Sequence, residues 1–151
     1  MSAKEAVLEL VSNRKARFNY EILDTLETGI VLVGTEVKSL RMHHASLEGA
    51  FVQEEKGSLW LLNCTIEPYK FGNIHNHVTN RPRKLLVHKY ETRKWAAKTA
   101  EKGLTMIPLR LYFKNGLIKV EIGLGKGKKM HDKRESIKER ELKRSLSRES
   151  D

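Results

Sequence analysis

The sequence predicts a mainly β fold, a small antiparallel barrel or sandwich of six or seven strands with one helix late in the chain. Apolar and polar residues alternate on both sides of Asn115-Gly116, and a second alternating stretch surrounds Lys56-Gly57. Further segments rich in strand formers recur between residues 18 and 124, separated by turn residues. Closure into a barrel would protect the edges of so many short strands.

The first part of the chain is predicted to hold a short, weak helix followed by strands. The helix is expected over residues 3–11, where the apolar residues share one side: Val7, Leu8 and Val11. Strand formers then recur from residue 18 to residue 37, and Thr28-Gly29 is predicted to separate two strands.

The middle of the chain contains a predicted hairpin, with strands at 50–54 and 58–64 around a turn at Lys56-Gly57. Residues 68–82 have no clear periodicity and contain Gly, Asn and Pro, so we predict a loop there. A short buried strand is expected at 83–87, in "RKLLV".

The last structured part is predicted to be a helix and a hairpin. Three alanines favour a helix over residues 88–102, and Gly103 is suited to end it. Residues 107–124 alternate with period two on both sides of Asn115-Gly116, which predicts a hairpin with a type I′ turn.

The chain of 151 residues fits one domain, and its net charge of +10 exceeds what solubility requires. A basic domain of this size favours a polyanionic partner, nucleic acid before an acidic membrane surface. The basic residues gather at 13–17, at 80–99 and from Lys126 onward, and aromatic residues that could stack on bases lie near these stretches: Tyr20, Tyr69 and Trp95. Any single basic stretch could be a solvated face, but three together favour RNA or DNA.

The single cysteine, Cys64, cannot form an internal disulfide, and we expect a buried thiol in a reducing compartment. No apolar run approaches the roughly 18 residues of a membrane span, and Glu5 and Glu9 interrupt the start where a signal peptide needs apolar residues. We therefore expect a cytoplasmic protein that does not enter a membrane.

Catalysis has little support in the sequence. His75 and His77 in "HNH" have the spacing of a metal pair on a strand, but no cysteine or carboxylate lies beside them. A nucleophilic pair of Cys64 with a histidine is the other alternative, and a buried thiol is favoured over it. A nuclease would need clustered acidic metal ligands, which the sequence does not place. We expect a non-enzymatic protein without metal or cofactor.

Residues 125–151 form a polar tail, with ten basic and six acidic residues from Lys126 onward. Their composition suits a helix over 133–148, but the apolar residues share no face, so such a helix has nothing to bury on its own domain. We expect a tail that is disordered when free and helical on an anionic partner, with an inert solubilising tail as the alternative. The predicted units are 1–12 (extension or short helix), 13–124 (RNA-binding β-barrel) and 125–151 (basic tail).

Several motifs, in order along residues 13–141, resemble the SsrA-binding protein (small protein B, SmpB) family of bacterial trans-translation. They are "NRKARFNYEI", "ETGIVLVGTEVKSLR", "RPRKLLVHKYE", "KGLTMIPLRLYFKNGLIKVEIGLGKGKK" and "HDKRESIKERE". The chain departs from many relatives at Met42-His43-His44 and lacks a proline in the loop after His77.

The resemblance implies an oligonucleotide-binding-type barrel with flanking helices. It also implies binding, as one protein per RNA, to the tRNA-like domain of transfer-messenger RNA and delivery of that RNA to the empty A site of a stalled ribosome. The tail would lie in the empty mRNA channel, as a helix against small-subunit ribosomal RNA. No small-molecule substrate is implied.

The resemblance also implies RNA-contacting residues, which fall in four segments of the chain. They are Asn13, Lys15, Ala16, Tyr20 and Glu27; Glu36, Lys38, Ser39 and Arg41; Arg83 and Lys84; and the basic hinge Lys126, Lys128 and Lys129. The implied decoding-centre segment is His131, Asp132, Lys133 and Arg134. Because carboxylates repel phosphate, Glu27 and Glu36 would accept hydrogen bonds from a base or a 2′-hydroxyl.

Two other binding functions remain open at this point. A general single-strand binder would lose affinity steeply with salt and show little preference for folded RNA. A structural ribosomal protein would be present on all translating ribosomes rather than on stalled ones.

Overall fold

A computed structural model describes residues 7–72, 75–128, 137–138 and 140–144. Two sheets contain the described strands. The main sheet has seven, in the order β1-β8-β4-β5-β7-β2-β9, with a further pairing between β8 and β9. A small second sheet pairs β3 (Ala45–Ser46) with β6 (Thr65–Ile66). The mainly β fold is confirmed.

The predicted C-terminal hairpin is the longest one in the main sheet. β8 (Thr105–Lys114) and β9 (Leu117–Gly127) pair from Lys114↔Leu117 to Thr105↔Gly125. The turn between them places Asn115 at φ 51° and Gly116 at φ 77°, as a type I′ turn requires. The hairpin at Lys56-Gly57 is confirmed as β4 (Phe51–Glu55) and β5 (Ser58–Leu62).

The strands close into a ring because β8 pairs with both β4 and β9. From β5 the ring continues through β7 (Arg83–Leu86) to β2 (Tyr20–Ile30), which pairs with β9 over most of its length. β1 (Val7–Ser12) pairs with the C-terminal half of β8, from Arg110 to Lys114. Hydrogen bonds between β2, near the start of the chain, and β9, near its described end, therefore hold the two ends of the domain together. The core lies inside the ring.

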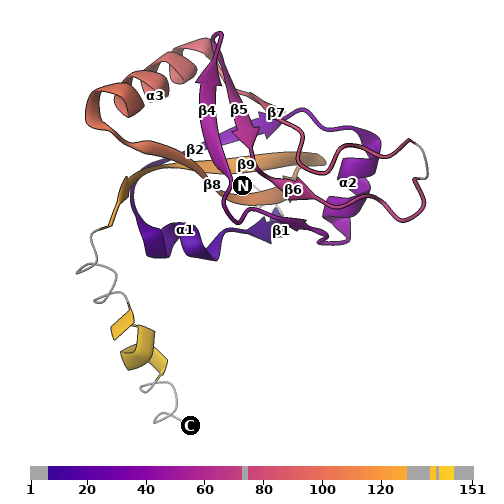
Figure 1. Cartoon of the computed structure of the whole chain (residues 1–151), viewed down its shortest axis with the longest axis horizontal. Coiled ribbons are helices and arrows are strands. Elements are labelled where there is room, and N and C mark those ends of the chain that lie inside the picture. The colour runs from indigo at the N-terminus through magenta and orange to yellow at the C-terminus, as the bar shows by residue number, and fades with distance from the viewer. Residues whose placement is uncertain (1–6, 73–74, 129–136, 139, 145–151) are drawn as a thin grey trace, which may run out of the picture.

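The ring encloses side chains from nearly every strand, among them Leu59, Leu61, Leu111, Val120 and Ile122, each with no exposed surface. α3 (Lys89–Lys102) packs against β4 and β5 and adds the buried Trp95. Figure 1 has α3 on one side of the ring, α1 (Arg14–Asn19) on the opposite side and α2 (Gly34–Arg41) at the right-hand end.

The helix expected over residues 3–11 is wrong for its described part, because Val7–Ser12 is the strand β1. Leu10 and Val11 are buried while Val7 and Leu8 remain exposed, so pairing with β8 decides the conformation rather than helix periodicity. The break expected at Thr28-Gly29 is also wrong. β2 runs through it without interruption, and Gly29 packs against the Leu86 side chain, where an added Cβ would lie 3.2 Å from the Cβ of Leu86.

The sequence pattern predicts neither α1 nor α2, and it places strand formers at residues 18–37, which overlap the end of α1 and the first half of α2. α1 begins after Asn13, whose side-chain oxygen accepts the Ala16 N–H at 3.2 Å. α2 contains the strand formers Thr35 and Val37, and its start is fixed by Glu36, which accepts the Val33 N–H at 2.9 Å. The predicted α3 is confirmed, and Gly103 ends it at φ 60°.

β9 extends to Gly127, beyond residue 124 where the sequence placed the end of the domain. Its last residues pair with the beginning of β2, and the Lys128 N–H donates to the Asn19 carbonyl at 2.9 Å. Residues 125–128 are therefore part of the ring rather than of the tail.

Candidate nucleic-acid interface

The structure divides the sequence-predicted RNA-contacting residues by exposure. Exposed are Lys15, Glu27, Lys38, Arg41, Lys84 and Lys126, and half-buried are Asn13, Tyr20 and Lys128. Buried are Ala16, Glu36, Ser39 and Arg83. The others lie outside the described residues: Lys129, His131, Asp132, Lys133 and Arg134.

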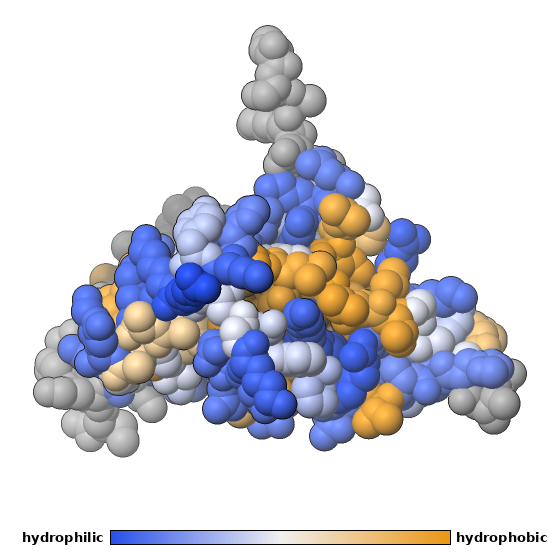
Figure 2. All heavy atoms as spheres, turned by 90° about the horizontal axis from the view of Figure 1, so that it is seen from above, coloured by the Kyte–Doolittle hydropathy of each residue, from blue (hydrophilic) through white to orange (hydrophobic). Residues whose placement is uncertain are grey.

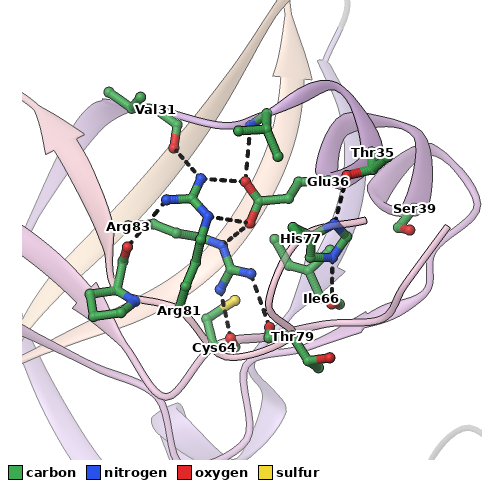
Figure 3. A network of polar contacts seen from close by, with 12 residues as sticks. Val31, Thr35, Glu36, Ser39, Cys64, Ile66, His77, Thr79, Arg81 and Arg83 are labelled. Carbon is green, nitrogen blue, oxygen red and sulfur yellow. Dashed lines mark hydrogen bonds and ion pairs between the residues drawn. The ribbon is translucent and has the colours of Figure 1, made fainter. Parts of the chain in front are cut away.

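Glu36 and Arg83 form the centre of a buried ionic network (Figure 3). Arg83 Nε donates to Glu36 Oε2 at 2.5 Å, and Arg81 donates to both carboxylate oxygens, with Nε 3.1 Å from Oε2. Arg83 also donates to the carbonyls of Cys64 at 2.7 Å and Thr79 at 2.9 Å. Neither side chain is exposed in this structure, and the RNA contacts expected of Glu36 and Arg83 stay a prediction.

The two other buried residues, Ser39 and Ala16, also hold neighbouring elements in place. The Ser39 hydroxyl donates to the Glu67 carbonyl at 2.7 Å and so ties α2 to the segment that follows β6. Ala16 packs with Ile107 and Leu109 in a small cluster beneath α1. Neither side chain presents a polar group at the surface, and the RNA contacts expected of Ser39 and Ala16 stay a prediction.

The network keeps its charges at neutral pH. Burial alone would raise the pKa of the Glu36 carboxyl, but hydrogen bonds from Arg81, Val33 and Arg83 and the charge of Arg83 bring it below 4.5. Burial raises the pKa of the neighbouring Cys64 thiol to about 11, against the opposing charge of Arg83. Cys64 is thus the buried thiol that the sequence predicted, and it is protonated and unsuited to be a nucleophile.

The histidines of "HNH" do not form a metal site in the described parts of the chain. Both ring nitrogens of His77 are engaged, Nδ1 with the Thr35 hydroxyl and Nε2 with the Ile66 carbonyl, each at 2.8 Å. No group of three or more His, Cys, Asp or Glu side chains among the described residues is placed to hold a metal ion. His77 instead connects the loop of residues 67–82 to α2 and β6.

Glu27 keeps an exposed carboxylate that is held in place by its neighbours. The Tyr112 hydroxyl donates to Glu27 Oε2, and Lys114 Nζ lies 3.2 Å from the same oxygen. The hydrogen bond from Tyr112, then Lys114 and Lys119, lower the pKa of Glu27 below 4.5 against the effect of burial. An ionised, oriented carboxylate suits the role that the sequence predicted for it, as a hydrogen-bond acceptor.

Replacing Tyr112 with Phe should raise the pKa of Glu27 toward 4.5, because the hydroxyl is the largest single cause of its lowering. The buried ring remains, so the fold should be kept. The measurement is an NMR titration of the Glu27 carboxyl carbon in both proteins, with Glu54 as an internal reference. An unchanged Glu27 titration would mean that Lys114 and Lys119 alone hold this carboxylate.

Lys119, whose charge helps to lower the pKa of Glu27, also lines an apolar hollow, here called the β7–α2 hollow. Its walls include Leu32, Arg41, Leu86, Phe113, Leu117 and Lys119. Leu86 and Leu117 are 52% and 59% exposed, and the Arg41 guanidinium lies over the Phe113 ring at 5.0 Å. Figure 2 shows a hydrophobic patch at the centre and right of the face seen from above, bordered by hydrophilic residues.

The sequence reasoning missed the apolar members of this hollow. In β7 the alternation turns Arg83 and Leu85 inward, and Lys84 and Leu86 outward. An apolar residue on the same outward face as Lys84 is the signal in the sequence that indicates this surface. Apolar contact area beside Arg41 and Lys119 is suited to a nucleotide, which offers both a flat base and a phosphate.

The described part of the tail is helical at residues 137–138 and 140–144. Its apolar residues are not buried, with Ile137 43% and Leu142 61% exposed. The Arg140 guanidinium lies over the Phe18 ring of α1 at 4.9 Å. That the free tail is disordered stays a prediction.

None of the helices that the described residues form is long and apolar enough to cross a membrane. Comparison with known proteins finds the family model "SmpB protein" over residues 10–151. The SsrA-binding protein of Chlamydia trachomatis serovar A is 56% identical over 141 residues, 93% of each chain. That of Thermosynechococcus vestitus is 49% identical over 145 residues, 95% of each chain.

A solved structure described as "tmRNA-SmpB: a journey to the center of the bacterial ribosome" matches with a TM-score of 0.68 and 47% identity. The match covers 87% of this chain and 94% of that one. With a family model that spans nearly the whole sequence and relatives at about half identity, the chain belongs to the SmpB protein family.

Proposed function

We propose that this chain is a non-enzymatic RNA-binding adaptor of trans-translation, which binds the tRNA-like domain of transfer-messenger RNA and delivers it to the A site of stalled ribosomes. The β7–α2 hollow is the observation that carries the proposal, because it combines exposed apolar surface with two cations. Relatives named SsrA-binding protein and a matching structure described by tmRNA, SmpB and the ribosome support it. Such partners would be met in the cytoplasm.

The hollow fits a folded RNA better than a featureless polyanion. Leu86, Leu117 and Phe113 give a surface for an unstacked base or a sugar, while Arg41 and Lys119 meet phosphates. Glu27 repels phosphate and accepts a hydrogen bond from a base or a 2′-hydroxyl, so it selects for shape. A general single-strand binder would not need a carboxylate at this position.

The ring of antiparallel strands supports an oligonucleotide-binding-type barrel as the RNA-binding body. Lys126 and Lys128 lie at its edge, where β9 ends, and with Lys129 form the basic hinge of the proposal. The tail would enter the empty mRNA channel, and His131, Asp132, Lys133 and Arg134 would contact the decoding centre. The exposed, helical residues 140–144 are compatible with a helix whose partner is external.

The test is the affinity of an Arg41→Ala/Lys119→Ala variant for the tRNA-like domain of transfer-messenger RNA, by filter binding at several salt concentrations. We expect the affinity to fall about tenfold or more. We also expect its dependence on salt concentration to weaken by the amount that corresponds to about two lost phosphate contacts. A Lys56→Ala/Lys102→Ala variant removes the same charge at exposed positions away from the hollow, and its affinity should be unchanged.

A chain ending at Lys128 shows whether the tail contributes to this affinity, and it retains every described residue of the ring. Equal affinity of this chain and the full chain is expected if the tail is reserved for the ribosome. Equal losses in both double variants would mean bulk attraction, as in a general single-strand binder, and would contradict the proposal. Presence on all translating ribosomes would instead favour a structural ribosomal protein.

A further inference from the structure

The loop of residues 67–82 carries an exposed aromatic pair that the hollow does not include. Phe71 is 69% exposed, and its ring packs edge-on against Tyr69 with the centroids 5.5 Å apart. A phenylalanine that is mostly exposed to water forgoes most of the stabilisation of burial. An exposed ring of this kind is available to a partner with a flat apolar surface.

Positive charge surrounds this pair. The ammonium group of Lys38 lies 5.2 Å from the centre of the Tyr69 ring, and that of Lys70 lies 6.0 Å from the centre of the Phe71 ring. Aromatic rings between lysines are typical of surfaces that stack on bases while the cations meet the phosphates. A lipid-binding or peptide-binding patch would need more contiguous apolar area than one exposed ring provides.

Hydrogen bonds anchor the described residues of the loop that presents the pair. The Asn76 side chain accepts the Tyr69 N–H at 2.7 Å and donates to the Tyr69 carbonyl at 2.8 Å. Gly72 allows this contact, since a Cβ there would lie 2.7 Å from Asn76 Nδ2. His77 and the Glu36–Arg81–Arg83 network fix the other half of the loop to α2 and β6 (Figure 3). These contacts position the Tyr69 backbone before any partner binds, which lowers the entropic cost of binding.

The aromatic pair is continuous with the proposed RNA-binding face through α2. Lys38 contacts Tyr69, and Arg41, one helical turn further, lines the β7–α2 hollow. Figure 1 has α2 and this loop at the end of the molecule opposite the described tail residues 140–144. An RNA seated in the hollow would therefore lie close enough to contact the loop. The tail would be too far away to contact the loop.

We propose that Phe71, with Tyr69, Lys38 and Lys70, is a stacking platform for an unpaired base of the same transfer-messenger RNA that occupies the hollow. This inference rests on the proposed function and extends it to a second contact. The base stacks on the open face of Phe71, and the two lysines meet its flanking phosphates. Its contribution is sequence-tolerant, because every base has a face on which a ring can stack.

The test compares Phe71→Ala, Phe71→Tyr and the full wild-type chain for binding to full-length transfer-messenger RNA. Phe71→Ala should weaken binding about tenfold with an unchanged salt slope, because stacking releases no counterions. Phe71→Tyr should bind like the wild type. Val78→Ala is the matched control, a similarly exposed apolar residue of the same loop (66%) that should bind normally.

A photo-reactive benzoylphenylalanine at position 71 adds a direct readout, and one at position 78 is its control. Cross-links from position 71 to an unpaired base are expected, with few from position 78. If Phe71→Ala binds the RNA as tightly as the wild type and position 71 gives no cross-link, the platform is overturned and the proposed function is left intact. A wild-type chain without preference for transfer-messenger RNA would contradict the proposed function itself. Cross-linking to a protein in a ribosome-containing sample, and not to the RNA, would also overturn the platform.

Discussion

Glu36→Gln should lower the free energy of unfolding by about 3–5 kcal/mol, because it leaves two arginines without their shared counter-charge inside the protein. Arg83 has no exposed surface and cannot turn to water, and Arg81 is largely covered. The loss should be seen as an earlier midpoint in urea unfolding at pH 7. A change too small to measure would mean that water reaches the arginines and that the network does not hold α2.

Glu48→Gln is the matched control for this experiment. Glu48 also pairs with a basic residue, Lys15, at 2.5 Å, but both side chains are about two-thirds exposed. Surface pairs of this kind contribute little, so the midpoint of unfolding should not move. The two variants remove the same charge and differ in burial.

The pH dependence gives the same interaction a second readout. The folded-state pKa of Glu36 lies below 4.5, so the carboxylate binds protons less readily in the folded than in the unfolded chain. Its stabilising contribution is therefore complete above pH 4.5 and is lost as the pH falls through the folded-state pKa. Glu36→Gln should remove this part of the acid sensitivity.

Replacing Asp132, Lys133 and Arg134 together with Ala should abolish tagging of stalled chains while solution affinity for transfer-messenger RNA stays within about threefold. These residues follow the end of β9 at Gly127 and lie outside the described residues. The sequence combines both signs of charge there, as recognition of a specific ribosomal RNA surface would require. The measurement is tagged product from an mRNA without a stop codon, in a reconstituted translation system.

A second triple variant separates this segment from the rest of the tail. Glu141, Lys143 and Arg144 have the same charges and lie among the exposed helical residues. Their replacement with Ala should reduce tagging less than the first triple variant does. If RNA affinity falls in parallel with tagging in the first variant, the tail is an ordinary electrostatic arm, and the division of labour between ring and tail is wrong.

The sequence pattern within a few neighbouring residues was enough to predict those helices and hairpins that are stabilised mainly by interactions between neighbouring residues. The Asn115-Gly116 hairpin, the Lys56-Gly57 hairpin and α3 each carry their signal within a few residues. The elements that were mispredicted depend on distant partners. β1 is a strand because it pairs with β8. α2 is a helix although Thr35 and Val37 favour strands, because the buried carboxylate of Glu36 fixes its first turn. Propensity is outweighed there by tertiary contacts.

The candidate site divides in a similar way. Resemblance selected Glu27, Lys38 and Arg41, which the structure leaves exposed, together with Glu36 and Arg83, which it buries. Sequence likeness does not separate a residue that touches RNA from one that holds its neighbour in place. That separation requires the inward or outward direction of each side chain, which the ring determines.

Closure of the ring has a consequence for how this protein is made. β2 is among the first strands to be synthesised, yet most of its pairing partners lie in β9, about a hundred residues later. A copy that ended before residue 117 would keep β2 and β8 with long unpaired edges, which aggregate or are degraded. Only a copy that extends through β9 can close the ring, so a protein that we assign to clearing unfinished chains can bind RNA only when its own synthesis has passed residue 127.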